Sequence, residues 1–106
     1  MIQQIINDIR KLNSEGKIKW TAHIITRLQE RNINPNDIKE CIMNGEIIEC
    51  YPDDYPYPSY LINGKFMNNK HIHVVIGIGE CFIWLISAYK PDINKWDDSF
   101  KNRKGF

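Results

Sequence analysis

The sequence predicts an α+β domain, in which N-terminal helices pack on one face of a mostly antiparallel, four-stranded sheet. Apolar residues recur every three or four positions through the first 45 residues, and from about Glu46 onward they alternate with polar ones. The later segments are joined by short or modest connections, which favours antiparallel pairing. A chain of 106 residues with 42% hydrophobic and 25% charged residues suits one core. We therefore expect residues 1–106 to form a single domain.

Three helices are expected before Glu46. The first has an apolar face, after which residues 13–16 end it. The second opens at Thr21 or just before it and runs to about Arg31, with an apolar arc along one side. The third begins with Asn34 as N-cap and Pro35 in the first turn, and Gly45 is expected as its left-handed stop. The apolar residues of the first two helices are Ile2, Ile5, Ile6, Ile9, Leu12, Trp20, Ile24, Ile25 and Leu28.

Four strands are expected in the second half, at residues 47–51, 60–66, 71–78 and 81–89. Residues 67–70 form a turn, and Gly79-Glu80 is the two-residue signal of a tight hairpin. Residues 52–59 contain three prolines, so we expect an extended loop that carries tyrosines. The polar tail after Tyr89 has Trp96 and Phe100 as candidate anchors.

Charge and cysteine content exclude several classes of protein. Fourteen Lys and Arg against thirteen Asp and Glu leave a net charge of +1, so any nucleic-acid surface must be local. Cys41, Cys50 and Cys81 are too scattered for a disulfide framework or a zinc motif, and we expect them reduced and buried among apolar residues. No signal peptide or membrane-spanning run is present, which makes the cytoplasm the expected location.

The second helix carries a cationic stripe. His23, Arg27 and Arg31 follow one another at four-residue spacing along the border of its apolar arc, where their side chains are neighbours. Border positions usually hold solvated charges, and Glu30 could neutralise either arginine. The alternative is a phosphate-binding edge with an imidazole beside it.

The third strand places two histidines on one face. His71 and His73 alternate with Ile72 and Val74, so the aliphatic side should meet the helices and the histidine side should be open. A His-x-His pair could hold a metal, but no third ligand lies at a useful spacing. His73 is instead expected to act as a general acid or base, the alternative being a half-buried histidine with a hydrogen-bond partner.

The remaining chemistry fits RNA. No phosphate-binding glycine loop, nucleophile elbow or Cys-x-x-Cys motif is present, so no cofactor is expected. Histidine, arginine, lysine and tyrosine can cleave RNA without a metal, because the 2′-OH supplies the nucleophile. Tyr51, Tyr55 and Tyr57 could stack on bases, although a solvated linker explains the loop equally well.

Several motifs together resemble a known family. They are Trp20-x-x-His23-x-x-x-Arg27-x-x-x-Arg31, Gly45-Glu46-Ile47-Ile48-Glu49-x-Tyr51-Pro52, Pro58-Ser59, His73-Val74-Val75 and Ser87-Ala88-Tyr89. The pattern is similar to a bacterial domain-of-unknown-function family grouped with the RelE-like toxins, alongside HigB, BrnT and MqsR.

The resemblance implies a RelE-like ribonuclease toxin fold and the toxin role in a bacterial toxin–antitoxin pair. Such a protein would be a metal-independent endoribonuclease, an mRNA interferase, and its partners would be RNA, including ribosome-bound mRNA, and a co-encoded antitoxin. The matching positions imply catalytic roles for His23, Arg27, His73 and Tyr89, with Arg31 binding RNA. The alternative is a non-catalytic member that binds protein or RNA.

The register of the last hairpin decides whether two of these residues meet. With a strict two-residue turn at Gly79-Glu80, His73 pairs with Ile86 and Tyr89 lies on the opposite face of the sheet. A shared site therefore requires a β-bulge, a longer turn, or a tyrosine that reaches round the end of the strand.

Overall fold

The computed structural model describes residues 2–67 and 69–104 and shows the expected α+β architecture, with three helices and five strands in these residues. The strands form one sheet in the order β1-β5-β4-β3-β2. Only β1 and β5 pair in parallel, and the other three pairings are antiparallel. In chain order the elements are α1 (Ile2–Ser14), β1 (Ile18–Lys19), α2 (Ala22–Glu30), α3 (Pro35–Asn44), β2 (Glu46–Tyr51), β3 (Ser59–Phe66), β4 (Lys70–Gly79) and β5 (Phe82–Tyr89).

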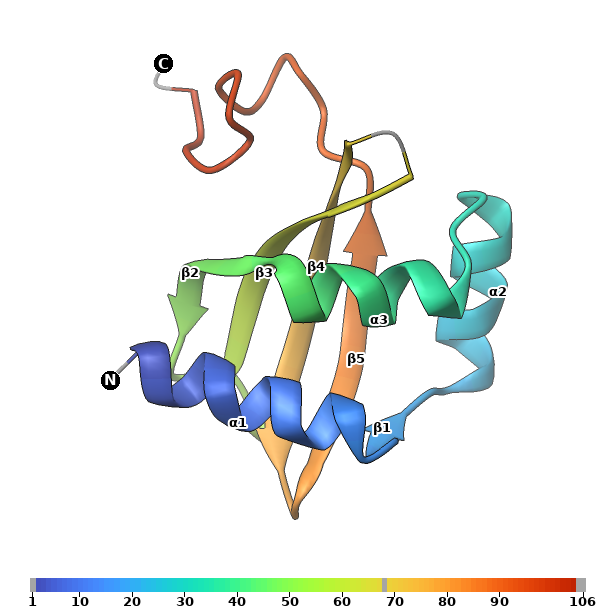
Figure 1. The fold of residues 1–106 in the computed structure, drawn as a ribbon, viewed down its shortest axis with the longest axis vertical. Helices are drawn as coiled ribbons and strands as arrows, with labels where there is room; N and C mark the ends of the chain where they lie inside the picture. The colour runs from blue at the N-terminus through green and yellow to red at the C-terminus, as the bar shows by residue number, and fades with distance from the viewer. Residues whose placement is uncertain (1, 68, 105–106) are drawn as a thin grey trace.

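The helices cover one face of the sheet. Figure 1 shows α1 and α3 lying across that face, while α2 stands beside the β5 edge. Aliphatic side chains from all three helices and from the inward side of the strands form one core. Its fully buried members include Ile9, Leu28, Ile38, Ile42, Ile62, Ile72, Val74, Ile76 and Ile83.

Local capping fixes where α2 and α3 begin, close to the predicted positions. The Thr21 hydroxyl accepts a hydrogen bond from the Ile24 backbone N–H at 3.1 Å, which satisfies a free donor of the first turn. At α3 the Asn34 N–H donates to the Asp37 carboxylate at 3.0 Å, and Pro35 occupies the first helical position. Asp37 is buried because it serves as this cap.

The prediction that Gly45 ends α3 in a left-handed conformation is wrong. Gly45 has φ −86° and ψ 176°, which is extended backbone. Glycine is needed there because a Cβ would lie 2.5 Å from the Cys41 carbonyl oxygen and 2.7 Å from the Ile62 side chain. A Cβ added to Gly64 on β3 would likewise lie 2.5 Å from the Cys41 carbonyl oxygen. The two glycines therefore let α3 lie close against β3.

The sequence predicted four strands, but the sheet in the described residues has five, and the strand that was not predicted is β1. Ile18 and Lys19 form the two-residue β1, which pairs with Ile83 and Trp84 of β5. The Ile83 N–H also donates to the Lys17 carbonyl at 2.9 Å. A strand of two residues is too short to show an alternating pattern, so only its partner reveals it.

The β4–β5 hairpin turns one residue later than predicted. Glu80 and Cys81 have φ of 55° and 65°, and Gly79 pairs with Phe82. Positive φ at both central residues matches the right-handed twist of the flanking strands. The earlier turn at residues 67–70 includes Asn68, which lies outside the described residues.

The three cysteines are free, but only one is buried. Cys41 lies in the core, where burial raises the pKa of its thiol to about 12. Cys50 and Cys81 are exposed, contrary to the prediction, because one lies on the edge strand β2 and the other in the hairpin turn. In the described part of the chain, no helix has the length and apolar character needed to cross a membrane.

Candidate functional site on the histidine-bearing face of the sheet

The face of the sheet turned away from the helices carries the polar side chains. Along β4, Ile72, Val74 and Ile76 enter the core, so His71 and His73 point to the other side. Asn63 and Lys65 of β3 pair with His73 and His71 and share their side of the sheet. We call this side the histidine face.

A β-bulge in β5 brings Tyr89 onto the histidine face. Ile76 pairs with Leu85, but Val75 pairs with Ser87, so Ile86 is an extra residue. The shift places Tyr89 directly opposite His73, and their rings meet edge to face with centroids 5.4 Å apart. Of the three routes to a shared site, the bulge is the one that the structure uses.

A second bulge does the same for β2. The register shifts between Ile47 and Glu49, which leaves Ile48 as the extra residue. Ile47 packs against the core, whereas Glu49 and Tyr51 then face the histidine side. The two bulges together gather Glu49, Tyr51 and Tyr89 on the face that bears His73.

His73 lies at the centre of this cluster and is completely buried. Its Nε2 lies 2.7 Å from the Phe100 carbonyl oxygen, and since a carbonyl only accepts, Nε2 carries the proton. The Nδ1 atom is buried without a hydrogen-bond partner in the described residues. Burial lowers the pKa of His73, so the ring is a neutral imidazole with a free lone pair on Nδ1.

The C-terminal segment covers the histidine face, which makes the predicted open face wrong. Residues 91–104, here called the strap, cross the sheet after β5 and place Trp96 edge-on against His73, with ring centroids 4.4 Å apart. Trp96 is buried, which confirms it as an anchor, and the Phe100 ring lies 4.7 Å from that of His71. Trp96 and Leu61 are buried outside the main core, so the strap creates a small second core.

A charged pair holds the end of the strap. Arg103 donates to both Glu49 carboxylate oxygens, at 2.8 and 3.1 Å, and stacks over Trp96 at 4.7 Å. The Tyr51 hydroxyl donates to Glu49 at 2.5 Å. The bonds from Arg103 lower the pKa of Glu49, while burial and the bond to Glu49 raise the pKa of Tyr51 to about 12.

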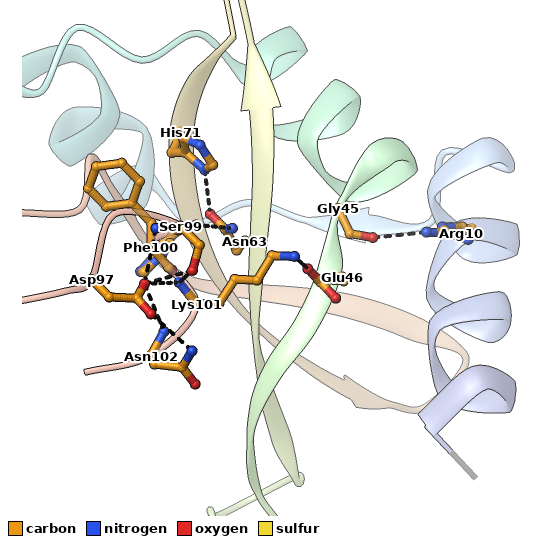
Figure 2. A network of polar contacts seen from close by, with 11 residues as sticks. Arg10, Gly45, Glu46, Asn63, His71, Asp97, Ser99, Phe100, Lys101 and Asn102 are labelled. Atoms are coloured by element: carbon orange, nitrogen blue, oxygen red, sulfur yellow. Dashed lines mark hydrogen bonds and ion pairs between the residues drawn. The ribbon is translucent and has the colours of Figure 1, made fainter. Parts of the chain in front are cut away.

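An open cleft of about 840 Å³ adjoins the covered cluster. His71, Lys65 and Lys101 line it, together with polar and acidic residues from α3, β2 and the strap. Figure 2 shows His71 beside Asn63, which lies 3.1 Å from Nδ1, and Lys101 extended to Glu46 at 2.5 Å. Burial and the two lysines lower the pKa of His71, which keeps this half-buried ring neutral.

The cationic stripe of α2 lies elsewhere. His23 and Arg27 are exposed on α2, whose inward residues pack on the opposite side of the sheet from His73. The structure therefore does not bring His23 or Arg27 together with His73. Arg31 has a structural contact, because its guanidinium donates to the Ala88 carbonyl at 2.7 Å on the part of the β5 edge beyond β1.

The tyrosines of the proline-rich loop are separated from the cluster. Tyr55 is 96% exposed. Tyr57 stacks on Trp84 with centroids 5.6 Å apart, and Lys19 lies over the neighbouring Phe82. Of the three predicted RNA-binding tyrosines, Tyr51 is the one that lies on the histidine face, where it bonds to Glu49.

The chain matches one family model. The model, Domain of unknown function (DUF4258), covers residues 20–90, more than half of the 106 residues. The chain belongs to the DUF4258 family. No curated protein and no solved structure gave a significant match. The DUF4258 region contains α2, α3 and β2–β5, and it ends where the strap begins.

Sequence reasoning missed two members of the polar cluster of this DUF4258 chain, Glu49 and Arg103, and it gave His71 no role except in a possible metal pair with His73. A signal for the bulges is present in the strands themselves. In β5 the residues that point into the core are Ile83, Leu85 and then Ala88. The inward residues change from odd to even positions, which indicates one extra residue between Leu85 and Ala88. In β2 strict alternation would place the apolar Ile47 on the same face of the sheet as the polar Glu49 and Tyr51, and this mismatch is the signal of a bulge between them. Arg103 carries no signal, because its partner is 54 residues away.

No metal site accompanies the cluster. Within residues 2–67 and 69–104, no group of three or more His, Cys, Asp or Glu side chains is arranged to hold an ion. The groups that lie together on the histidine face are two imidazoles, two phenols, a carboxylate and cations. This is a set for proton transfer and anion binding.

Proposed function

We propose that the chain is a metal-independent endoribonuclease, the toxin of a bacterial toxin–antitoxin pair with a RelE-like fold. It would cut messenger RNA in the cytoplasm, free or on the ribosome, and a co-encoded antitoxin would silence it. The resemblance of its motifs to RelE-like toxins motivates the role. The histidine face is the surface that supports it best.

One observation carries the proposal: the two bulges collect His71, His73, Tyr51 and Tyr89 on one face, beside a cleft with two lysines. β-Bulges interrupt the ladder, and they recur next to active sites because they redirect side chains. Here both redirect a polar residue away from the core. The result is a concentration of titratable groups on one face of the sheet, of which His71 lines the accessible cleft.

Each accessible group of the cleft has a role in the proposed cleavage. His71 is neutral and can take a proton from an RNA 2′-OH, which then attacks the adjacent phosphorus. Lys65 and Lys101 line the same cleft and can stabilise the charge on the phosphate oxygens. Glu46 holds Lys101 at present, so phosphate would compete with this carboxylate for the ammonium group.

The burial of His73 favours a second candidate function. A histidine with no exposed surface cannot exchange protons with a substrate in this arrangement. If the strap stays in place and His71 alone does not cleave RNA, the domain is a non-catalytic module that binds RNA or a protein partner at the cleft. The cleavage assay below separates the two.

The test is cleavage of single-stranded RNA by the purified full chain in the presence of a chelator, with and without ribosomes. We expect slow cleavage that the chelator does not stop, and growth arrest when the chain is expressed in bacteria. Lys65→Ala should weaken RNA binding and reduce its salt slope by about 1, as for the loss of one phosphate contact.

Lys11→Ala is the matched control, because Lys11 is exposed on α1, on the helix side of the sheet. It should leave RNA binding unchanged. RNA binding without cleavage under every condition would favour the non-catalytic module. The absence of both would refute any role in RNA processing.

A further inference from the structure

The strap is held to the histidine face by side chains as well as by its backbone. It is an irregular loop closed on itself by the bridge between Trp96 and Arg103 and by hydrogen bonds to the Asp97 carboxylate. It has no partner strand in the main sheet. Its contacts with the sheet include Trp96 on His73, the Phe100 ring on His71, the Ser99 carbonyl with Asn63, the Phe100 carbonyl with His73, Lys101 with Glu46, and Arg103 with Glu49.

Most of these contacts involve exposed or part-exposed groups. The side chains of Lys101 and Arg103 are 49% and 59% exposed, and ion pairs in such positions are screened by water. The Asn63 bond to Ser99 is long, at 3.4 Å. Only Trp96 is buried deeply. The strap is therefore anchored chiefly at one residue, whereas β4 beneath it is paired on both sides.

One ring nitrogen of His73, the residue beneath Trp96, lacks a hydrogen-bond partner in the described part of the chain. His73 Nδ1 is buried and has no donor within the described residues, although a buried acceptor is almost always paired. The same ring gives its only proton to the strap, through the Phe100 carbonyl. The Nδ1 lone pair of His73 can therefore accept a hydrogen bond or a proton from a donor other than the strap.

We propose that the strap is a removable cover, and that its release joins His73 to His71 in a single acid/base site for RNA. The two histidines lie two residues apart on one strand face, so they are separated by about 7 Å along β4. Two imidazoles at that distance can flank one phosphodiester group. This inference rests on the proposed ribonuclease function and adds the second proton-transfer group that the closed structure withholds.

The roles follow from the surroundings of each ring. Lys65 of β3 stays beside His71 when the strap leaves with its Lys101, and this cation disfavours protonation of the ring, so His71 acts as the base. His73 loses the burial that lowers its pKa, so after release it can carry a proton and act as the acid. His71 takes the 2′-OH proton, the 2′ oxygen bonds to phosphorus, and the bond from phosphorus to the 5′ oxygen breaks. His73 protonates that 5′ oxygen, which leaves a 2′,3′-cyclic phosphate and a 5′-OH.

The test follows the access of reagent to His73, which requires no RNA cleavage. Purified chains are treated with diethyl pyrocarbonate, and modification of His23, His71 and His73 is measured separately by mass spectrometry. In the wild type His73 should be protected, while the exposed His23 should react and serve as an internal reference. Trp96→Ala should expose His73 and leave the reaction of His23 unchanged.

The matched control is Ile93→Ala, since Ile93 belongs to the strap but is 67% exposed. In this variant His73 should remain as protected from diethyl pyrocarbonate as it is in the wild type. Arg103→Ala is a second opening variant that keeps Trp96 in place. If the open form is a minor state of the wild type, full release should raise the rate of RNA cleavage by ~10–1,000-fold.

Two results would overturn the proposal. One is continued protection of His73 in both opening variants while circular dichroism shows a folded chain. The other is loss of the fold in both, which would make the strap an integral part of the core. If His73 becomes reactive but no variant cuts RNA, the cover stands and the ribonuclease function fails.

Discussion

The α2 helix and the histidine face both carry imidazole and cationic side chains, but in opposite surroundings. On α2, His23 and Arg27 are exposed, and no side-chain partner of either is found in the described residues. On the histidine face, His73 is buried, Glu49 is held by two bonds from Arg103, and several pKa values are shifted. Spacing in the sequence finds the first cluster and the two histidines of the second, whereas only the folded chain adds Glu49 and Arg103 to those histidines. Perturbed titration next to a cleft is the stronger indication of a functional site.

The largest expected effect on stability comes from comparing substitutions on the buried and the exposed sides of α2. Leu28 is fully buried against the sheet, so Leu28→Ala should lower the free energy of unfolding by about 2–5 kcal/mol. Arg27→Ala, one position earlier and exposed, should change it by no more than about 0.5 kcal/mol. Urea denaturation measures both. A large loss in Arg27→Ala would show that the stripe supports the fold through contacts that are absent here.

A smaller effect is expected at Arg31, the one member of the stripe that contacts the sheet. Arg31→Ala removes the hydrogen bond to the Ala88 carbonyl and should cost about 1 kcal/mol in the same denaturation experiment. Arg27→Ala again serves as the control. Equal stability of the two variants would mean that water replaces the guanidinium at the β5 edge without loss.

The smallest expected effect is a pH dependence of the free energy of unfolding, which arises from the two histidines of the histidine face. The pKa values of His71 and His73 are lowered from 6.5 in the folded chain. The unfolded chain therefore binds more protons near pH 6, and the stabilisation present above about pH 6.5 is lost as pH falls through the folded values. The free energy of unfolding should decrease between pH 7.5 and 5.5, and less so in His73→Gln. An identical slope in that variant would assign the effect to other groups.

The general architecture could be predicted from the sequence because it depends on period and capping. The helical repeats, the Thr21 and Asn34 caps and the alternation along β4 are local, and each led to the correct element. The two-residue β1 and the turn at Glu80-Cys81 escaped, because pairing with a distant segment defines them.

The candidate site was harder to predict, because a single extra residue in a strand reverses every later side chain. Without the bulge at Ile86, Tyr89 would point away from His73. The cover over His73 depends on Trp96 and Arg103, which lie more than twenty residues further along the chain. Trp96 was predicted as an anchor, but the surface that it covers was not predicted. Long-range contacts of this kind leave no trace in spacing.

The central claim is that proton transfer occurs on the histidine face and not on α2, and paired variants test it most directly. Rates of RNA cleavage should be measured with chelator present for the wild type, His71→Ala and His23→Ala, after circular dichroism has shown that all three are folded. We expect His71→Ala to lose a factor of ~10²–10⁴, the usual contribution of a general acid or base, and His23→Ala to keep the wild-type rate. Loss of cleavage in His23→Ala with full activity in His71→Ala would contradict the account and return the chemistry to the cationic stripe of α2.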